Sequence, residues 1–303
     1  MIIDVHTHLS TREQWGKVFV EAFDRGYTGY TGIDLEVTPE IHWEAVAAVS
    51  HAIVFGINSI ALGMHTPNDA IAAYAKTHPE KIIGFMSVDP NDPDALEEID
   101  RCVNDLGLKG IKMSPVYQHY DPNGARARRV HRRAEELGLP ILTHAAYHVI
   151  ANTPMEWANP LLYDPVAREF PNLKIILAHI GLPWYVDAMV MIRKHPNVFA
   201  DVSGGVPLRP WWGYQALSFC HENHVMHKLL FGSDFPIATI EDTIDALRTA
   251  NRFAEGTNMP QVPEQEIEDL IHRDSLSLLG LMRFNLKLLA QKVNPVLLCS
   301  SIV

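Results

Sequence analysis

Short apolar runs recur along the chain, and a stretch with helical spacing follows each of them. The eight runs are Ile2–His6, Ala52–Ile57, Ile82–Val88, Leu108–Met113, Pro140–His144, Lys174–His179, Val198–Ser203 and Leu229–Asp234. Continuous apolar strands that alternate with helices are typical of a parallel sheet covered by helices. Eight such units predict an α/β fold of the (β/α)8 TIM-barrel type. The G-x-G-x-x-G motif of an open dinucleotide-binding sheet is absent from the sequence.

The spacing is interrupted between the first and second runs, where residues 9–50 are rich in glycine and aromatic residues. A long insertion in a compact barrel is usually functional. We therefore expect residues 9–50 to form a lid over the barrel mouth; a peripheral decoration is the alternative. We expect one domain at 1–281, with a last helix from Pro263 to Leu279, and a C-terminal tail at 282–303. The aromatic residues of the lid include Trp15, Phe19, Tyr27, Tyr30 and Trp43.

Composition excludes several classes of protein. The 303 residues are 47% hydrophobic and 20% charged, as in ordinary globular proteins. A net charge of −11 without a basic stripe argues against a nucleic-acid partner. No apolar stretch approaches the length of a membrane span. Three scattered cysteines without a C-x-x-C pair indicate a cytoplasmic protein without disulfides. Apolar helices and the apolar tail leave a homodimer open.

Metal-ligand residue types end four of the predicted strands. His6 and His8 are spaced i, i+2 and therefore project from one face of the first strand. His144, His179 and Asp234 end the fifth, sixth and eighth strands. These strand ends meet at the barrel mouth, where catalytic residues lie. Imidazole and carboxylate groups are costly to bury there unless they are paired or bind a cation. The pattern predicts a metal site.

At these residues the chain resembles the amidohydrolase superfamily, and within it the amidohydrolase-2 branch of TIM-barrel metal-dependent hydrolases. The resemblance runs from Met1 to about Leu281. It implies that His6, His8 and His144 are metal ligands and that Asp234 is a fourth ligand or the base beside the metal. It implies that His179 supports the ligands or polarises the substrate. The motifs that carry it are Asp4-Val5-His6-Thr7-His8, Gly110-Ile111-Lys112, Thr143-His144, Ala178-His179-Ile180-Gly181-Leu182-Pro183-Trp184, Asp201-Val202-Ser203 and Gly232-Ser233-Asp234-Phe235-Pro236.

The resemblance also bears on Lys112 and on the number of metal ions. In binuclear members of the superfamily, a lysine at the end of the fourth strand is carboxylated and bridges two metals. Lys112 could act in that way, bind a substrate carboxylate, or have a structural role. We expect one divalent ion, zinc in the first place and manganese as the alternative, with a second ion left open. Tyr117, His148 and Trp184 lie on loops after strands four to six and are candidate substrate contacts.

The function expected first is hydrolysis of a small carbonyl compound such as an amide, lactone or cyclic ester. A bound ion lowers the pKa of its water to about 7, and the resulting hydroxide attacks the carbonyl. Asp234 would move the proton, and His179 would stabilise the oxyanion. The alternative is a metal-dependent decarboxylase or hydratase of a small carboxylic acid, which the same branch contains. Both His6 and His8 are present, whereas many of those decarboxylases replace the first histidine by glutamate or alanine, and this favours hydrolysis.

Overall fold

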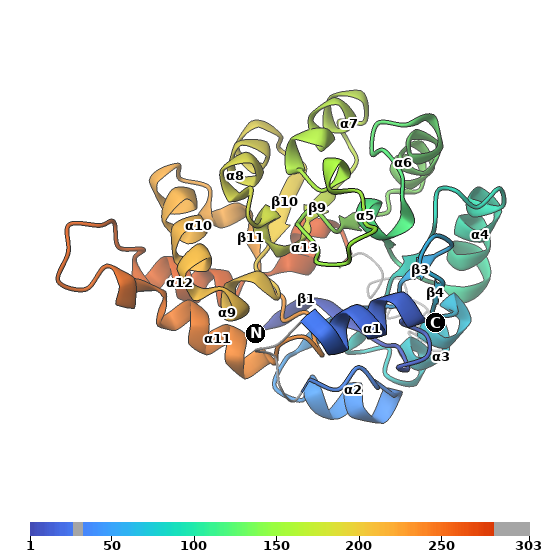
Figure 1. The fold of residues 1–303 in the computed structure, drawn as a ribbon, viewed down its shortest axis with the longest axis horizontal. Coiled ribbons are helices and arrows are strands. Elements are labelled where there is room, and N and C mark those ends of the chain that lie inside the picture. The colour runs from blue at the N-terminus through green and yellow to red at the C-terminus, as the bar shows by residue number, and fades with distance from the viewer. Residues whose placement is uncertain (27–32, 282–303) are drawn as a thin grey trace, which may run out of the picture.

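Parallel strands form a barrel at the centre of the molecule, and helices cover its outside (Figure 1). The computed structural model describes residues 1–26 and 33–281. The predicted TIM-barrel architecture is confirmed, with two short strands, β5 and β6, in the third position. The strands of the barrel are β1 (Ile3–His8), β2 (His51–Phe55), β5 (Ile82–Gly84), β6 (Met86–Ser87), β7 (Ile111–Met113), β8 (Ile141–Thr143), β9 (Ile175–Leu177), β10 (Val198–Asp201) and β11 (Leu229–Leu230).

The division between β5 and β6 falls at Phe85. β5 pairs with β2, whereas β6 pairs with β7, so the run predicted as one strand changes its partner half-way. The amide of Phe85 still donates to the carbonyl of Val54 at 2.9 Å, and the amide of Met86 donates to Gly110 at 2.9 Å. These bonds keep the barrel wall continuous.

The barrel closes where the segment after β11 runs beside β1. The amide of Asp234 donates to the carbonyl of His6 at 2.8 Å, and the amide of His8 donates to the carbonyl of Phe235 at 2.9 Å. Thr7 and Phe235 form a parallel bridge. The backbone that closes the barrel therefore also carries three of the predicted metal-site residues.

The helices begin and end where local sequence signals place them. Gly138, at φ 67°, ends α6, and Thr239 with Asp242 forms a capping box at the start of α11. The prediction of a single last helix from Pro263 to Leu279 is wrong, because Asp274 caps a separate helix, α13.

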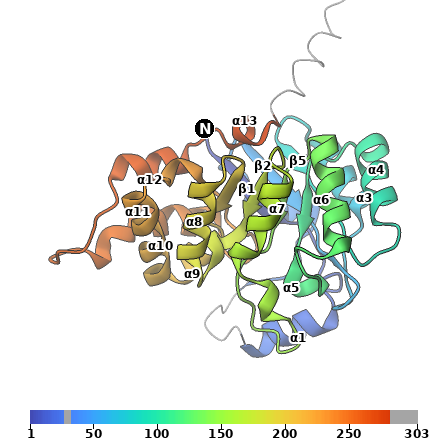
Figure 2. The same cartoon turned by 90° about the horizontal axis from the view of Figure 1, so that it is seen from above.

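Figure 2 shows the helices around the strands. They are α1 (Lys17–Gly26), α2 (Pro39–Ala45), α3 (Asn68–Thr77), α4 (Ala95–Arg101), α5 (Pro115–Gln118), α6 (Ala125–Leu137), α7 (Asp164–Glu169), α8 (Tyr185–Lys194), α9 (Gly205–Leu208), α10 (Pro210–Glu222), α11 (Ile240–Arg248), α12 (Glu264–Ile271) and α13 (Ser275–Leu279).

Large apolar side chains fill the barrel interior below the mouth. Phe55, Phe85 and Phe199 belong to one buried cluster with aliphatic residues of the strands, and Leu276 and Leu279 of α13 pack against it. A barrel interior packed in this way is a core and not a pore. The polar residues at the strand ends therefore rest on a rigid apolar floor.

The predicted lid at residues 9–50 contains two helices, α1 and α2, in its described part. Trp15 and Phe19 pack into a buried cluster with Tyr117 at the barrel mouth. Trp43, on α2, instead stacks on His78 with ring centroids 3.7 Å apart, and it does not line the pocket at the mouth. Tyr27, Tyr30 and the tail at 282–303 lie outside the described residues. Within the described part of the chain, no helix has the length and apolarity that a membrane crossing requires.

Candidate metal centre and pocket

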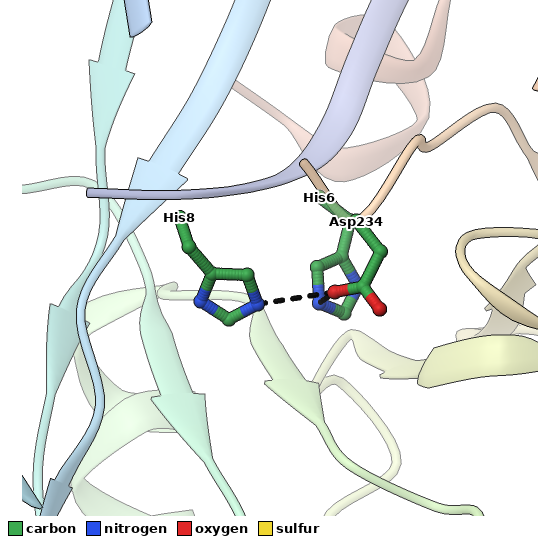
Figure 3. A group of neighbouring side chains, drawn as sticks. All are labelled: His6, His8 and Asp234. Atoms are coloured by element: carbon green, nitrogen blue, oxygen red, sulfur yellow. Dashed lines mark hydrogen bonds and ion pairs between the residues drawn. The ribbon is translucent and has the colours of Figure 1, made fainter. Parts of the chain in front are cut away.

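Three predicted ligands meet at the barrel mouth (Figure 3). His6 and His8 extend from the same face of β1, and Asp234 follows β11 with φ 69°. One oxygen of Asp234, Oδ1, lies 3.2 Å from Nε2 of His6 and 3.1 Å from Nε2 of His8. The ligand atoms of the three residues all lie within 4.8 Å of one another. Two imidazole nitrogens and a carboxylate oxygen at this spacing fit a divalent cation.

A fourth predicted ligand, His144, follows β8 beside this group. Its Nδ1 lies 3.2 Å from Nε2 of His179, which follows β9. The other nitrogen of His144, Nε2, is buried and has no hydrogen-bond partner among the described residues. An unpaired buried nitrogen is costly, because it has lost its hydrogen bonds to water. A metal ion at the mouth would give this atom a partner, so the residue fits the predicted role.

Burial and neighbouring charges set the protonation of the histidines. Burial lowers the pKa of His8 to about 3, and it also lowers the pKa of His144 and of His179, so all three are neutral at pH 7. Burial and Lys112 lower the pKa of His6, but Asp201 and Asp234 outweigh them and raise it. A second proton of His6 would lie on Nε2, facing Asp234, where a metal ion would replace it.

Asp234 is held in place by its backbone and by Gly204. Burial raises the pKa of the Asp234 carboxyl, but the neighbouring His179 and His6 imidazoles and the hydrogen bonds from His6 and His8 lower it by more, so the group is ionised. Gly204 has φ 55°, and a Cβ atom at this position would lie 2.6 Å from Oδ2 of Asp234. The absence of a side chain at Gly204 therefore gives the carboxylate its room.

Lys112 lies at the pocket floor, as the sequence predicts. Its side chain is buried, its Nζ lies 3.2 Å from Nε2 of His6, and the ammonium lies 4.6 Å from the centroid of the Phe55 ring. Burial lowers the pKa of Lys112 to about 8. An amine with this pKa is partly neutral near pH 8 and lies within reach of a bound ligand.

Aromatic rings form one wall of the pocket above the metal site. Trp15 and Phe19 stack with ring centroids 4.9 Å apart, and Phe19 stacks on His148 at 5.7 Å. Tyr117 contacts both His144 and His148 with its ring. Tyr117 and His148 therefore lie where the sequence predicts them. Trp184 does not line the pocket; it precedes α8 and packs at the edge of the aromatic cluster.

The pocket lining also contains residues to which the sequence assigns no role. They come from the loops after β9, β10 and β11, namely Leu182, Leu208, Arg209 and Ile237. Arg209 is half-buried and places a guanidinium group beside a largely apolar pocket. The only sequence signal for these residues is their position on βα loops at the mouth.

A comparison with protein families decides the classification. The model of the family described as "Amidohydrolase" matches residues 3–281. The chain belongs to the amidohydrolase family. The predicted resemblance is thereby confirmed across the described barrel.

Curated relatives of this amidohydrolase include two gamma-resorcylate decarboxylases. The protein from Rhodococcus jostii is 25% identical over 47% of this chain and 51% of its own length. The protein from a Rhizobium species is 27% identical over 59% of this chain and 67% of its own length. The chain thus spans about half the length of the first of these relatives. Their names favour the decarboxylase alternative over the hydrolysis expected first.

Solved structures support the amidohydrolase fold. An uncharacterised TIM-barrel protein from Bordetella bronchiseptica has a TM-score of 0.70 at 19% identity, covering 92% of this chain and 98% of that protein. A dihydroxybenzoic acid decarboxylase from a Polaromonas species, with bound manganese and 2-nitroresorcinol, has a TM-score of 0.65 at 17% identity and covers 94% and 98%. At this level of identity the likeness shows the fold alone.

Proposed function

We propose that this amidohydrolase is a metal-dependent decarboxylase of a small aromatic carboxylic acid. The observation that carries the proposal is a metal-ligand group at the floor of a pocket walled by stacked aromatic rings. The curated relatives that are named decarboxylases support this reaction over hydrolysis of an amide or lactone. The substrate is expected to be a flat acid with an oxygen substituent beside its carboxyl group.

His6, His8, His144 and Asp234 would hold the ion. Three nitrogens and one oxygen suit either manganese or zinc. We propose manganese ahead of the zinc expected first, because a decarboxylase of the same fold binds manganese. A divalent ion held by these residues would supply a positive charge at the floor of the pocket for an anionic substrate. We propose that the site binds a single ion.

In the reaction, the bond between the ring carbon and the carboxyl carbon breaks. Its electron pair remains with the ring, a proton takes the place of the carboxyl group, and carbon dioxide leaves. Asp234 lies beside His6 and His8, and we propose it as the group that delivers this proton. Because Asp234 is ionised at rest, it must first take up a proton, from water or from the substrate's hydroxyl group.

The pocket walls orient the substrate. Trp15 and Phe19 offer flat faces for a substrate ring, an arrangement that is favourable for offset stacking. Arg209, in the pocket lining, is proposed to bind an anionic substituent with a charge-assisted hydrogen bond. Aromatic and aliphatic side chains also exclude water, which strengthens these electrostatic contacts. Lys112 is retained as a substrate contact at the floor.

The test is product analysis on the manganese-loaded protein. A panel of hydroxybenzoic acids is incubated beside a panel of lactones and amides, with carbon dioxide release and ring products measured. We expect carbon dioxide from at least one acid and its loss in Asp234→Asn. Hydrolysis of a lactone without any decarboxylation would refute the proposal and support the hydrolase function expected first from the sequence.

A further inference from the structure

The hydroxyl group of Ser203 lies among three polar partners behind the metal site. It donates to Oδ1 of Asp201 at 2.5 Å, and its oxygen lies 3.0 Å from Nδ1 of His6 and 3.0 Å from Nδ1 of His179. Ser203 and Asp201 are both fully buried. A hydroxyl group has one proton, and here the carboxylate receives it. The Ser203 oxygen can therefore only accept hydrogen bonds from the two imidazoles.

Two further acceptors face the same imidazole nitrogens. Nδ1 of His6 lies 3.0 Å from Oδ2 of Asp201, and Nδ1 of His179 lies 3.1 Å from the backbone carbonyl of Ser203. A carbonyl oxygen and an ionised carboxylate cannot donate. Asp201 accepts hydrogen bonds from two backbone amides and from the Ser203 hydroxyl group, as a carboxylate does. Nδ1 of both histidines must carry a proton.

The protonation of His179 determines that of His144. In the neutral form of His179, a proton on Nδ1 leaves Nε2 as an acceptor. The group 3.2 Å from this Nε2 is Nδ1 of His144, which must therefore carry a proton and donate it. A neutral His144 is then left with a bare Nε2. That nitrogen is the buried atom without a hydrogen-bond partner among the described residues.

We propose that Asp201 and Ser203 are positioning residues that hold protons on Nδ1 of His6 and His179 and, through His179, on Nδ1 of His144. Nε2 of His6 and Nε2 of His144 are then the nitrogens available to a metal ion. A hydrogen bond from the second nitrogen of a ligand histidine fixes the orientation and basicity of the ring. The inference rests on the metal site of the proposed function, and it extends the roles of that site to two residues behind the ligands.

An alternative role for Asp201 is direct metal binding, since one of its oxygens lies within 4.8 Å of ligand atoms of His6 and His179. Its hydrogen bonds argue against this role. Oδ1 accepts from the backbone amides of His179 at 3.0 Å and Ser203 at 3.1 Å, as well as from the Ser203 hydroxyl group. Oδ2 accepts from Nδ1 of His6. Both oxygens are already occupied by donors from the protein.

The decisive variant is Asp201→Asn. The amide oxygen would take the place of Oδ1, because three donors converge there. The NH2 group would then face Nδ1 of His6 as a donor and require this nitrogen to be bare. His6 would move its proton to Nε2, the metal-facing nitrogen. Asp89→Asn is the matched control, because Asp89 is a buried carboxylate that accepts from the backbone amides of Ile60 and Asn91 and does not line the pocket.

The test combines two measurements on protein labelled with nitrogen-15 in histidine. Long-range proton–nitrogen spectra report which ring nitrogen carries the proton, in the metal-free and zinc-loaded forms. Chelator competition gives the affinity for zinc and manganese. In the wild type we expect protons on Nδ1 of His6, His144 and His179. In Asp201→Asn we expect His6 to lose its Nδ1 proton and metal affinity to fall 10- to 100-fold, while the control keeps both.

The wild-type spectrum alone decides the assignment even if Asp201→Asn does not fold. A proton on Nε2 instead of Nδ1 in His144 or His179 would overturn the inference, and so would unchanged metal affinity in a folded Asp201→Asn protein. If the wild type binds no metal while its protons lie as stated, the proposed function fails and the assignment of the protons stands.

Discussion

His131 is a buried histidine remote from the metal site, and it predicts how stability depends on pH. It lies on the inner face of α6, close to the rings of Tyr163 and Phe170. Its side chain is fully buried, and neither ring nitrogen has a hydrogen-bond partner among the described residues. Burial lowers its pKa from 6.5 to about 3. The folded protein therefore holds this ring neutral throughout the mildly acidic range.

The expected loss of stability follows from linkage. Below pH 6.5, His131 binds a proton in the unfolded chain but stays neutral in the folded chain. The free energy of unfolding therefore falls as the pH falls. Each pH unit in this range is worth about 1.4 kcal/mol. Between pH 7 and pH 5, His131 therefore lowers the free energy of unfolding by about 2 kcal/mol, because 1.5 pH units of this interval lie below 6.5. Any folded pKa well below 5 gives the same result.

The assay is urea unfolding of the wild type and His131→Leu at pH 7, 6 and 5. Leucine has a similar volume, carries no proton and leaves no unpaired ring nitrogen in the core. The variant should lose about 2 kcal/mol less stability than the wild type over this range. His65→Leu is the matched control, because His65 is exposed on the short strand β4 (Met64–His65) and should leave the pH dependence unchanged. Equal pH dependence in His131→Leu and the wild type would refute the argument.

Three further predictions concern the metal site and the aromatic wall. Gly204→Ala should lower metal affinity at least tenfold in chelator competition, because the new Cβ displaces the carboxylate of Asp234; unchanged affinity would contradict the proposed ligand role. Trp15→Ala should destabilise the protein by roughly 3–5 kcal/mol in urea and raise KM for the aromatic acid, since Trp15 is buried, stacks on Phe19 and donates to the carbonyl of Leu35 at 3.0 Å. Chelation should lower the melting temperature, and manganese at 100 times its Kd should restore about 2.7 kcal/mol of stability, whereas an unshifted melting curve would exclude tight binding.

The meeting of the candidate ligands at the barrel mouth was predictable because two periodic patterns coincide. A strand brings His6 and His8 to one face, and parallel strands bring their ends together, so His144 and Asp234 could be placed beside them from sequence spacing alone. The division of the third strand was not predictable, because it depends on packing. The Phe85 ring occupies the space beside Gly110, where a Cβ atom would lie 2.4 Å from it.

The loop residues were predicted less well, since loops carry no hydrophobic period. Trp184 follows a turn in which His179 and Ile180 have φ values of 59° and 47°, a backbone conformation that the strand and helix periods do not predict. Arg209 comes from the loop after β10, and the sequence does not indicate that its side chain lines the pocket. Trp43 is one of several aromatic residues in the lid, and only the packing of α2 against His78 distinguishes it from Trp15.

The hydrogen bonds that close the barrel have a consequence for synthesis on the ribosome. The amide of Asp234 bonds to the carbonyl of His6, and the amide of His8 bonds to that of Phe235, although more than 200 residues separate the partners in sequence. A nascent chain that has emerged only as far as β10 therefore carries the three candidate histidine ligands, His6, His8 and His144, but lacks Asp234. In the proposed metal site, the fourth ligand would therefore arrive together with the last seam of the barrel, as one late event of synthesis.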